Sequence, residues 1–232
     1  MVVVLTTKQK DIVVLIPTLN EEKAITQTLD DVLEYAPKCR IAVLDSYSIN
    51  GTADIARSKG ATVVNAPKGG KGIAVRSVLP RVFAAFTGKC YVMIDGDYTY
   101  PAKHIPEVVE QIENGVDVVI GYRNKRAKGS MTVMNIIGNW GLSMLASVLY
   151  GVRVRDVCSG MWGFRRNVLS RYKLSSNGFT LEADLFVNTI KGKYKLAQIP
   201  IEYRARLDDS IAKLSIKDGF KIGWFLIKGR LR

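Results

Sequence analysis

The sequence contains few of the residues that build disulfide frameworks and zinc sites. Its 232 residues include three cysteines and a single histidine, His104. Cys39, Cys90 and Cys158 are odd in number, far apart and outside any CxxC spacing, which argues against a disulfide framework and a cysteine zinc site. With no second histidine for a metal cluster or a triad, His104 is interpreted as structural. The cysteine usage favours a reducing compartment.

Segments that direct secretion or join domains are also missing. The apolar stretch at 2–5 is too short for the core of a signal peptide, and polar residues 6–10 follow it in place of a cleavage site. We therefore expect a cytoplasmic protein. No internal repeat, low-complexity tract or flexible linker is visible. The length and the hydrophobic content of 47% predict a single domain over 1–232.

Two common phosphate-binding motifs are absent. The chain has no GxxxxGK[ST] loop, and no GxGxxG follows its first apolar run, which argues against nucleotide hydrolases of the P-loop type and against dinucleotide dehydrogenases. The KGGKG at 68–72 has glycines that expose backbone N–H groups and lysines that supply charge to a phosphate. A plain basic loop before a helix would have the same sequence.

Acidic residues are outnumbered, because 34 Lys and Arg against 21 Asp and Glu give a formal net charge of +13. Such an excess suits a negative partner: nucleic acid, an anionic membrane surface or a phosphorylated small molecule. RNA binding through 123–128 and the arginines late in the chain is the alternative from a different function class. No RNA-binding motif is present, and acids at strand ends would repel a phosphate backbone, so we expect no nucleic acid partner.

Residues 129–152 carry no charged side chain, and basic residues flank them on both sides. A helix of this length would span a bilayer. Asn135, Asn139, Ser143 and Ser147 make it a poor helix for the hydrocarbon core. The pattern favours a packed or interface-lying helix pair, and we assign 122–155 to an interfacial or acceptor-side helical segment.

Apolar runs alternate with helical patterns along the first half of the chain. The runs predict strands at 12–16, 41–44, 62–64, 91–94 and 116–120. Helical patterns lie between them, near 21–35, 52–59, 71–86 and 103–114. This alternation is typical of an α/β fold with a mostly parallel central sheet flanked by helices.

Acidic residues follow the predicted strands at their carboxyl ends. Glu21 follows the first strand, Asp45 the second, and Asp95 and Asp97 the fourth. Ligands of open α/β sheets bind at that edge. Two carboxylates separated only by Gly96 can hold one hard divalent cation that bridges to diphosphate oxygens. A turn with two solvated acids would show the same pattern.

Six motifs occur in one order over nearly the whole chain. They are PTLNE at 17–21, LDSYSINGT at 44–52, GKG at 70–72, IDGDYTYP at 94–101, DVCSGMWGFRR at 156–166, and IPIEYRAR at 199–206 followed by Ser210 and Lys213. Together they look like glycosyltransferase family 2, in the branch of dolichol-phosphate mannose synthases and polyprenyl-phosphate glucose synthases. The resemblance implies a nucleotide-diphospho-sugar transferase fold of the GT-A type, and Mg²⁺ or Mn²⁺ as the cofactor.

The resemblance also implies roles for residues at matching positions. Glu21 would accept hydrogen bonds from the donor ribose, and Asp45 would contact the nucleobase, within a donor site made of Pro17, Leu19, Glu21, Asp45, Lys71, Asp95 and Gly96. The metal ligands would be Asp95 and Asp97. The catalytic set, in which basic residues meet donor or acceptor phosphates, would be Asp97, Arg123, Arg204 and Lys213. The acceptor side would include Ser159, Gly160 and Glu182.

The implied activity is the inverting transfer of a hexose to a polyprenyl or dolichyl phosphate at the cytoplasmic face of a membrane. Departures from the family pattern at Ser46, Asn50 and Thr99 leave both GDP-mannose and UDP-glucose open as donors. A lipid phosphate is already an anionic nucleophile, so alignment and charge stabilisation would suffice. The alternative, a neutral hydroxyl acceptor, would need a carboxylate base, first Asp156 or Glu182. A partner subunit could supply a membrane anchor.

The carboxy-terminal segment predicts a basic amphipathic helix over 211–232. One stripe of this helix would carry Lys213, Lys217, Lys221, Lys228 and Arg232. Apolar residues would lie beside that stripe, namely Phe220, Trp224, Ile227 and Leu231. Lysine next to tryptophan and phenylalanine suits an anionic membrane surface, although a helix packed on the sheet with solvated lysines would show the same spacing.

Overall fold

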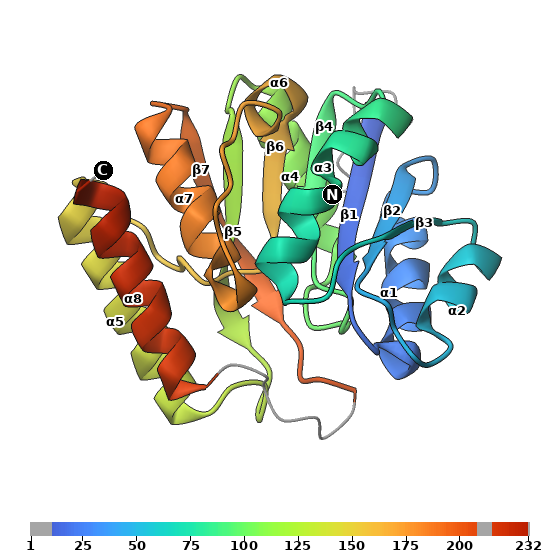
Figure 1. Cartoon of the computed structure of the whole chain (residues 1–232), viewed down its shortest axis with the longest axis horizontal. Coiled ribbons are helices and arrows are strands. Elements are labelled where there is room, and N and C mark those ends of the chain that lie inside the picture. The colour runs from blue at the N-terminus through green and yellow to red at the C-terminus, as the bar shows by residue number, and fades with distance from the viewer. Residues whose placement is uncertain (1–10, 208–214, 232) are drawn as a thin grey trace.

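The computed structural model describes residues 11–207 and 215–231. Its centre is a seven-stranded sheet in the order β3-β2-β1-β4-β6-β5-β7 (Figure 1). The strands are β1 (Ile12–Thr18), β2 (Arg40–Asp45), β3 (Thr62–Asn65), β4 (Cys90–Met93), β5 (Val118–Arg126), β6 (Trp162–Arg165) and β7 (Leu196–Tyr203). β6 runs antiparallel to β4 and β5, and the other pairings are parallel. The predicted α/β fold with a mostly parallel sheet is confirmed.

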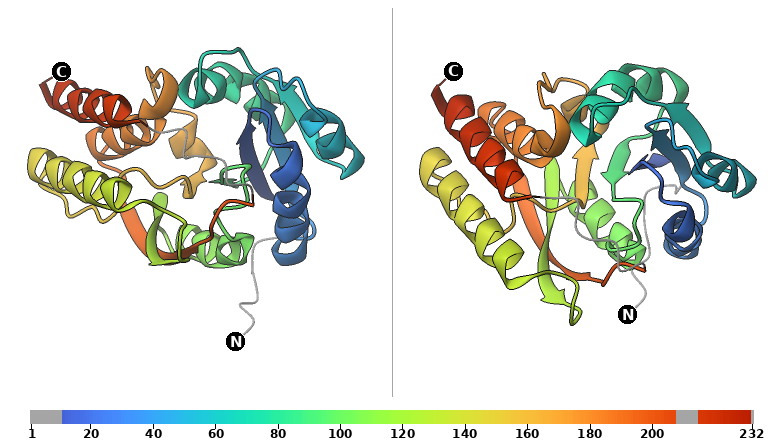
Figure 2. Two further views of the ribbon diagram at one scale, coloured as in Figure 1. Left: turned by 90° about the horizontal axis from the view of Figure 1, so that it is seen from below. Right: turned by 60° about the horizontal axis from the view of Figure 1, so that its bottom comes forward.

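Helices cover both faces of the sheet (Figure 2). They are α1 (Glu22–Tyr35), α2 (Thr52–Ser58), α3 (Lys71–Ala85), α4 (Ile105–Glu113), α5 (Val133–Tyr150), α6 (Arg166–Leu169), α7 (Leu181–Lys191) and α8 (Ile216–Leu231), with short 3₁₀ turns η2 (Ala102–His104) and η3 (Gly178–Thr180). Successive β1 side chains point to opposite faces, so Val13 and Leu15 join the core under α3 and α7, whereas Val14 and Ile16 join the core under α1 and α4.

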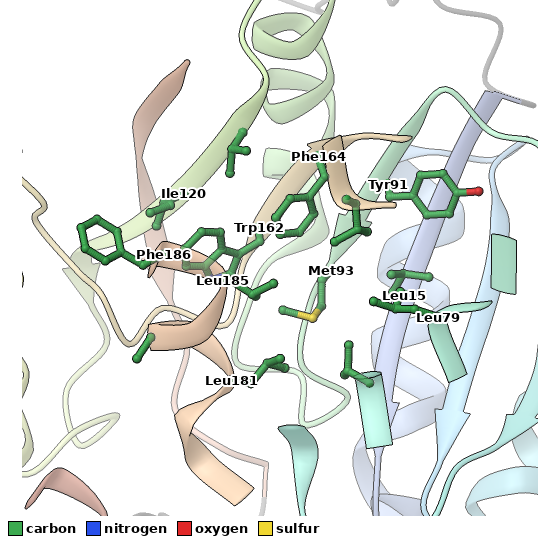
Figure 3. Packing of buried hydrophobic residues seen from close by; sticks show 14 of the residues in the cluster. Leu15, Leu79, Tyr91, Met93, Ile120, Trp162, Phe164, Leu181, Leu185 and Phe186 are labelled. Carbon is green, nitrogen blue, oxygen red and sulfur yellow. The ribbon is translucent and has the colours of Figure 1, made fainter. Parts of the chain in front are cut away.

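The core beneath α3 and α7 is built from large side chains (Figure 3). Trp162 and Phe164 of β6 stack with their ring centroids 5.8 Å apart. The Trp162 indole N–H donates to the carbonyl oxygen of Ser159 at 2.6 Å. Burying Trp162 therefore holds the preceding segment, 159–161, beside the end of β4.

The five predicted strands and four predicted helices of the first half are all present, with ends that differ by a few residues. β6 and β7 lie outside the predicted set. β6 has only four residues, which is too short for a clear alternation of apolar and polar side chains. β7 contains Pro200, a residue that lowers the strand signal, and the strand tolerates it because it lies at the sheet edge.

The uncharged segment forms one long helix, α5, so the prediction of a helix pair is wrong. Thr132 caps the start of α5, where its side chain accepts a hydrogen bond from the Asn135 N–H, and Gly151 at φ 66° ends it. Within the described ranges α5 is the one helix long and apolar enough to cross a membrane by length and composition.

The terminal helix α8 begins at Ile216, after the non-helical Ser215, and not at 211. Lys213 and Arg232, which we predicted to belong to its basic stripe, lie outside the described residues, as does Ser210. α8 packs beside α5 and α7 at one end of the molecule (Figures 1 and 2).

Candidate functional site

The carboxyl ends of β1, β2 and β4 meet at one edge of the sheet. The Ser46 N–H after β2 donates to the carbonyl oxygen of Thr18 at 3.0 Å. Gly96 follows β4 and lies against β1, where a Cβ atom would come within 2.7 Å of Thr18 Cγ2. A glycine at 96 therefore lets this segment pass close to β1 and brings Asp95 and Asp97 to the shared edge.

Asp97 is buried, with 6% of its surface exposed. Its Oδ1 accepts hydrogen bonds from the Thr99 N–H at 3.2 Å and the Thr99 hydroxyl at 2.6 Å. The Arg206 guanidinium lies 2.7 Å from Oδ2. Burial and the charge of Asp95 raise the pKa of Asp97, whereas Arg206 and Thr99 oppose that shift. The carboxylate is thus held in a fixed orientation beside a second negative charge.

Asp97 and Arg206 line a hollow of about 130 Å³ at this edge. Its wall also includes Glu21 from the loop after β1 and Asn50 from the loop after β2. The hollow is smaller than a typical cofactor site, so it can account for only part of a nucleotide-sugar site. A larger cavity of about 410 Å³ lies between α7 and α8, but none of the predicted metal or donor residues lines it.

Lys71, the first residue of α3, lies between two carboxylates. Its Nζ is 2.5 Å from Asp95 Oδ1 and 2.6 Å from Glu182 Oε1. Burial lowers the pKa of the Lys71 ammonium, but the charges of Asp95 and Glu182 outweigh burial and raise it above its ordinary value. Gly160 lies against Asp95, since a Cβ there would overlap its carboxylate. Four predicted residues from four segments therefore meet at one point.

Asp95 and Asp97 fit a divalent cation that is shared with a ligand. The negative charge of Asp95 contributes to the raised pKa of Asp97, and a cation between the two carboxylates would relieve this repulsion. Within 11–207 and 215–231, no group of three or more His, Cys, Asp and Glu side chains could enclose a metal. Two protein ligands leave coordination positions for diphosphate oxygens and water, as Mg²⁺ sites of this kind require.

The Asp45 carboxylate stabilises the loop after β2. It accepts hydrogen bonds from the Thr18 hydroxyl at 3.2 Å, the Ser48 N–H at 3.0 Å and the Ser48 hydroxyl at 2.5 Å, and it is almost fully buried. The Asn20 N–H donates to the same Ser48 hydroxyl, which ties the first two loops together. Asp45 therefore shapes the wall of the hollow, and its contact with a nucleobase stays a prediction. Pro17 is the half-buried penultimate residue of β1, and Leu19 is exposed on the loop that follows this strand.

Arg123 forms a buried ion pair with Asp156. Its Nε lies 2.7 Å from Asp156 Oδ2, its terminal nitrogen 2.8 Å from Oδ1, and its backbone N–H also donates to Oδ2. The guanidinium packs over the Tyr203 ring at 5.2 Å. Arg123 thus joins β5, β7 and the segment before β6, and Asp156, one of the two proposed bases, is engaged by a permanent positive charge.

Replacing Asp156 with asparagine is expected to lower the free energy of unfolding by about 3 kcal/mol or more, because a buried arginine would lose its charged partner. Denaturant unfolding would measure the loss. Asp54→Asn is the matched control, since its ion pair with Arg57 is exposed and its removal should cost less than about 1 kcal/mol. Equal stability of the two variants would show that the buried pair does not stabilise the fold.

Two other predicted site residues, Arg204 and Ser159, do not join the cluster around Asp95. Arg204 makes hydrogen bonds to Asp31 of α1 at 2.9 and 3.3 Å and lies over the Tyr98 ring at 4.1 Å, so it joins α1 to the loop after β4. Ser159 is fully buried, and its hydroxyl donates to the Gly121 carbonyl oxygen. Lys213 lies outside the described residues. The structure brings together Lys71, Asp95, Gly160 and Glu182, while Arg204 and Ser159 contact other partners.

Comparison of the sequence with known proteins shows the family of this chain. The sequence model described as "Glycosyl transferase family 2" matches residues 13–173, which is more than half of the chain. This chain belongs to glycosyltransferase family 2. It is similar to a dolichyl-phosphate hexose transferase of Haloferax volcanii, with 32% identity over 200 residues, 86% of each chain. It is also 26% identical to a dolichol-phosphate mannosyltransferase of Pyrococcus furiosus, over 83% of this chain and 56% of that protein.

The solved structures agree on the fold of this glycosyltransferase. Glucosyl-3-phosphoglycerate synthase from Mycobacterium tuberculosis, in complex with phosphoglyceric acid, superposes with a TM-score of 0.72 at 22% identity, covering 95% of this chain and 81% of that one. The same enzyme in complex with Mn²⁺, UDP and glucosyl-3-phosphoglycerate gives a TM-score of 0.71. The predicted GT-A fold is therefore confirmed. The predicted enzyme class, a glycosyltransferase, is confirmed by the family match and the relatives.

Arg206 was not among the predicted site residues, although this glycosyltransferase places it against Asp97. It lies in the same motif as Arg204, two residues further on. The motif contains both arginines, so the sequence could not show which of them reaches the paired aspartates. In the structure Arg204 pairs with Asp31, whereas Arg206 pairs with Asp97.

Proposed function

We propose that this enzyme transfers a hexose from a nucleotide-diphosphate sugar, GDP-mannose or UDP-glucose, to a polyprenyl or dolichyl phosphate, with inversion. The observation that carries the proposal is the pair Asp95 and Asp97 at the carboxyl edge of the sheet, with Lys71 and Arg206 in contact with them. Similarity to proteins named dolichyl-phosphate hexose transferase and polyprenol monophosphomannose synthase supports the lipid acceptor.

In this proposal Asp95 and Asp97 hold Mg²⁺ or Mn²⁺ against the donor diphosphate. The cation would supply positive charge to the departing nucleoside diphosphate. Lys71 and Arg206 add fixed positive charge on either side, and the loops after β1 and β2 orient the nucleoside. Glu21, which lines the hollow, would accept hydrogen bonds from the ribose hydroxyls in this proposal.

A phosphate acceptor also agrees with the ion pairs that Asp156 and Glu182 form. Asp156 pairs with Arg123, and Glu182 pairs with Lys71, so both base candidates are held by cations. Each candidate base therefore already has a cationic partner within the protein, and neither is left unpaired for an acceptor hydroxyl. A phosphate monoester oxygen needs no such base, and alignment with charge stabilisation is sufficient.

The location that suits this acceptor is the cytoplasmic face of a membrane, with the enzyme bound peripherally. The lipid phosphate is confined to the bilayer, while nucleotide sugars are dissolved, so the enzyme must meet both at the surface. The net charge of +13 favours an anionic surface. A partner subunit that anchors the enzyme remains compatible with this arrangement.

A donor panel tests the proposed function. GDP- and UDP-sugars are offered with a polyprenyl phosphate, with and without a chelator, and lipid-linked sugar is measured. We expect one nucleotide sugar to give product that disappears with the chelator. Transfer to a soluble hydroxyl compound such as phosphoglycerate, with none to the lipid phosphate, would overturn the acceptor assignment.

A further inference from the structure

The α5 helix exposes many of its large apolar side chains and buries two polar ones. Its buried residues are Asn139, Ser143 and Ala146. Half or more of the surface is exposed for six large apolar side chains of this helix, namely Val133, Met134, Ile137, Trp140, Met144 and Val148. A helix on the surface of a water-soluble protein has the opposite arrangement. Its outward face therefore suits an apolar environment.

The buried polar face ties α5 to the chain that follows it. The Ser143 hydroxyl accepts from the Val157 N–H at 3.1 Å, and the Ser147 hydroxyl accepts from the Val154 N–H at 3.0 Å. This following segment contains charged residues, including Asp156 in its buried ion pair. A transmembrane position would carry that segment into hydrocarbon or break these bonds, so α5 fits a helix that lies on a membrane and does not cross it.

The α8 helix packs beside α5 and also exposes large apolar side chains. It buries Ile222 and Leu226, and the carbonyl oxygen of Leu226 accepts from the Tyr150 hydroxyl of α5 at 2.8 Å. Ile216, Phe220, Trp224 and Leu231 of α8 are each more than 60% exposed. We call the outward faces of α5 and α8 the helical platform. Two packed helices that together expose this many large apolar side chains are uncommon unless something covers them.

The charges around the helical platform identify what covers it. Val133–Tyr150 carries no charged residue, and the single acid of α8, Asp218, is paired with Lys221. Exposed basic residues lie before α5, after α5 and along α8, namely Lys125, Arg126, Lys128, Arg153, Arg155, Lys217, Lys221, Lys228 and Arg230. Apolar faces with a basic surround fit anionic lipid, whereas a second copy would bring like charges together.

We propose that the helical platform docks the enzyme on an anionic membrane, with α5 and α8 lying in the plane of the interface. The biological purpose of this docking rests on the proposed lipid-phosphate acceptor, but the binding itself does not. Both helices begin on the side of the molecule where β5 and β7 end (Figure 1). The amino ends of α5 and α8 therefore lie at the same end of the molecule as the carboxyl edge of the sheet.

Tryptophan fluorescence gives a direct test. Trp140 and Trp224 are both 64% exposed on the platform, whereas Trp162 is fully buried in the core. With vesicles that contain phosphatidylglycerol and brominated lipid, we expect the emission of Trp140 and Trp224 to shift to shorter wavelength and to be quenched. A variant that keeps only Trp162, with Trp140→Phe and Trp224→Phe, should show neither effect while it still sediments with the vesicles.

Substitutions of apolar and of basic residues separate the hydrophobic contribution to vesicle binding from the electrostatic one. Trp140→Glu with Trp224→Glu should weaken binding to anionic vesicles at least tenfold, measured by sedimentation. Lys221→Glu should weaken it less and in a salt-dependent way. Lys89→Glu is the matched control, because Lys89 is also exposed and also pairs with an aspartate but lies just before β4, outside α5 and α8, so this variant should bind like the unchanged enzyme.

Three results would overturn the proposal. They are no binding to anionic vesicles, equal weakening by Lys89→Glu and Lys221→Glu, and a dimer in solution that shields Trp140 and Trp224 without lipid. Sugar transfer to detergent-dispersed polyprenyl phosphate separates this proposal from the proposed function. The variant with Trp140→Glu and Trp224→Glu should keep that transfer. If the unchanged enzyme binds vesicles but transfers no sugar, only the proposed function is overturned.

Discussion

Replacing Asp97 with asparagine is expected to reduce kcat/KM for sugar transfer by about 10²- to 10³-fold, the range seen when one preorganised electrostatic group is removed from an active site. Asparagine keeps the size of the side chain and can still accept from the Thr99 hydroxyl. It removes one anionic ligand from the proposed cation and leaves Arg206 without its charged partner. Steady-state rates with a saturating lipid phosphate would measure the effect.

Asp30→Asn is the control for Asp97→Asn, since Asp30 is more than half exposed on α1 and pairs with Lys59 at the surface. This variant should retain the activity of the unchanged enzyme. Folding of Asp97→Asn must be verified by its unfolding midpoint, because the carboxylate is buried. Full activity in a folded Asp97→Asn protein would remove Asp97 from the site.

Replacing Lys71 with methionine is expected to strengthen the binding of Mn²⁺ alone while it weakens catalysis. The ammonium contacts Asp95 at 2.5 Å and Glu182 at 2.6 Å, so a cation that binds Asp95 must compete with it. Hydrogen bonds to charged groups contribute about 1.5–3 kcal/mol, so the loss of this competitor should tighten Mn²⁺ binding roughly tenfold or more. Transfer should slow because the diphosphate loses a positive charge.

Electron paramagnetic resonance of Mn²⁺ titrated into the enzyme without nucleotide measures cation binding alone. It separates binding from catalysis, since the signal does not depend on turnover. Lys68→Met is the matched control, because Lys68 is an exposed lysine of the same KGGKG loop. It should change neither Mn²⁺ binding nor transfer appreciably. Weaker Mn²⁺ binding in Lys71→Met would mean that Lys71 supports the cation site and does not compete with it.

Much of the fold follows from local sequence patterns. The apolar runs give the buried strands, and the acids directly after them lie at the carboxyl edge because parallel strands end together. This is why Asp95 and Asp97 could be predicted with the edge on which they lie. β6 could not be predicted in the same way, because four residues of an antiparallel strand carry too little periodicity.

The partners of the site residues depend on contacts between distant parts of the chain. Lys71 and Glu182 are 111 residues apart, and no local pattern indicates that they meet. Arg123 and Arg204 were expected at phosphates, but their nearest acids are Asp156 and Asp31. Which basic residue faces which acid is decided by the packing of β5, β7 and α1, and the same packing decides which face of α5 is buried.

The central claim is that Asp95 and Asp97 bind a nucleoside diphosphate through a divalent cation. Isothermal titration of GDP and UDP, with Mn²⁺ and with a chelator, tests it most directly. We expect one of the two nucleotides to bind only when Mn²⁺ is present, and Asp95→Asn to lose that binding. Equal affinity with the chelator, or unchanged Mn²⁺-dependent binding in Asp95→Asn, would contradict the claim.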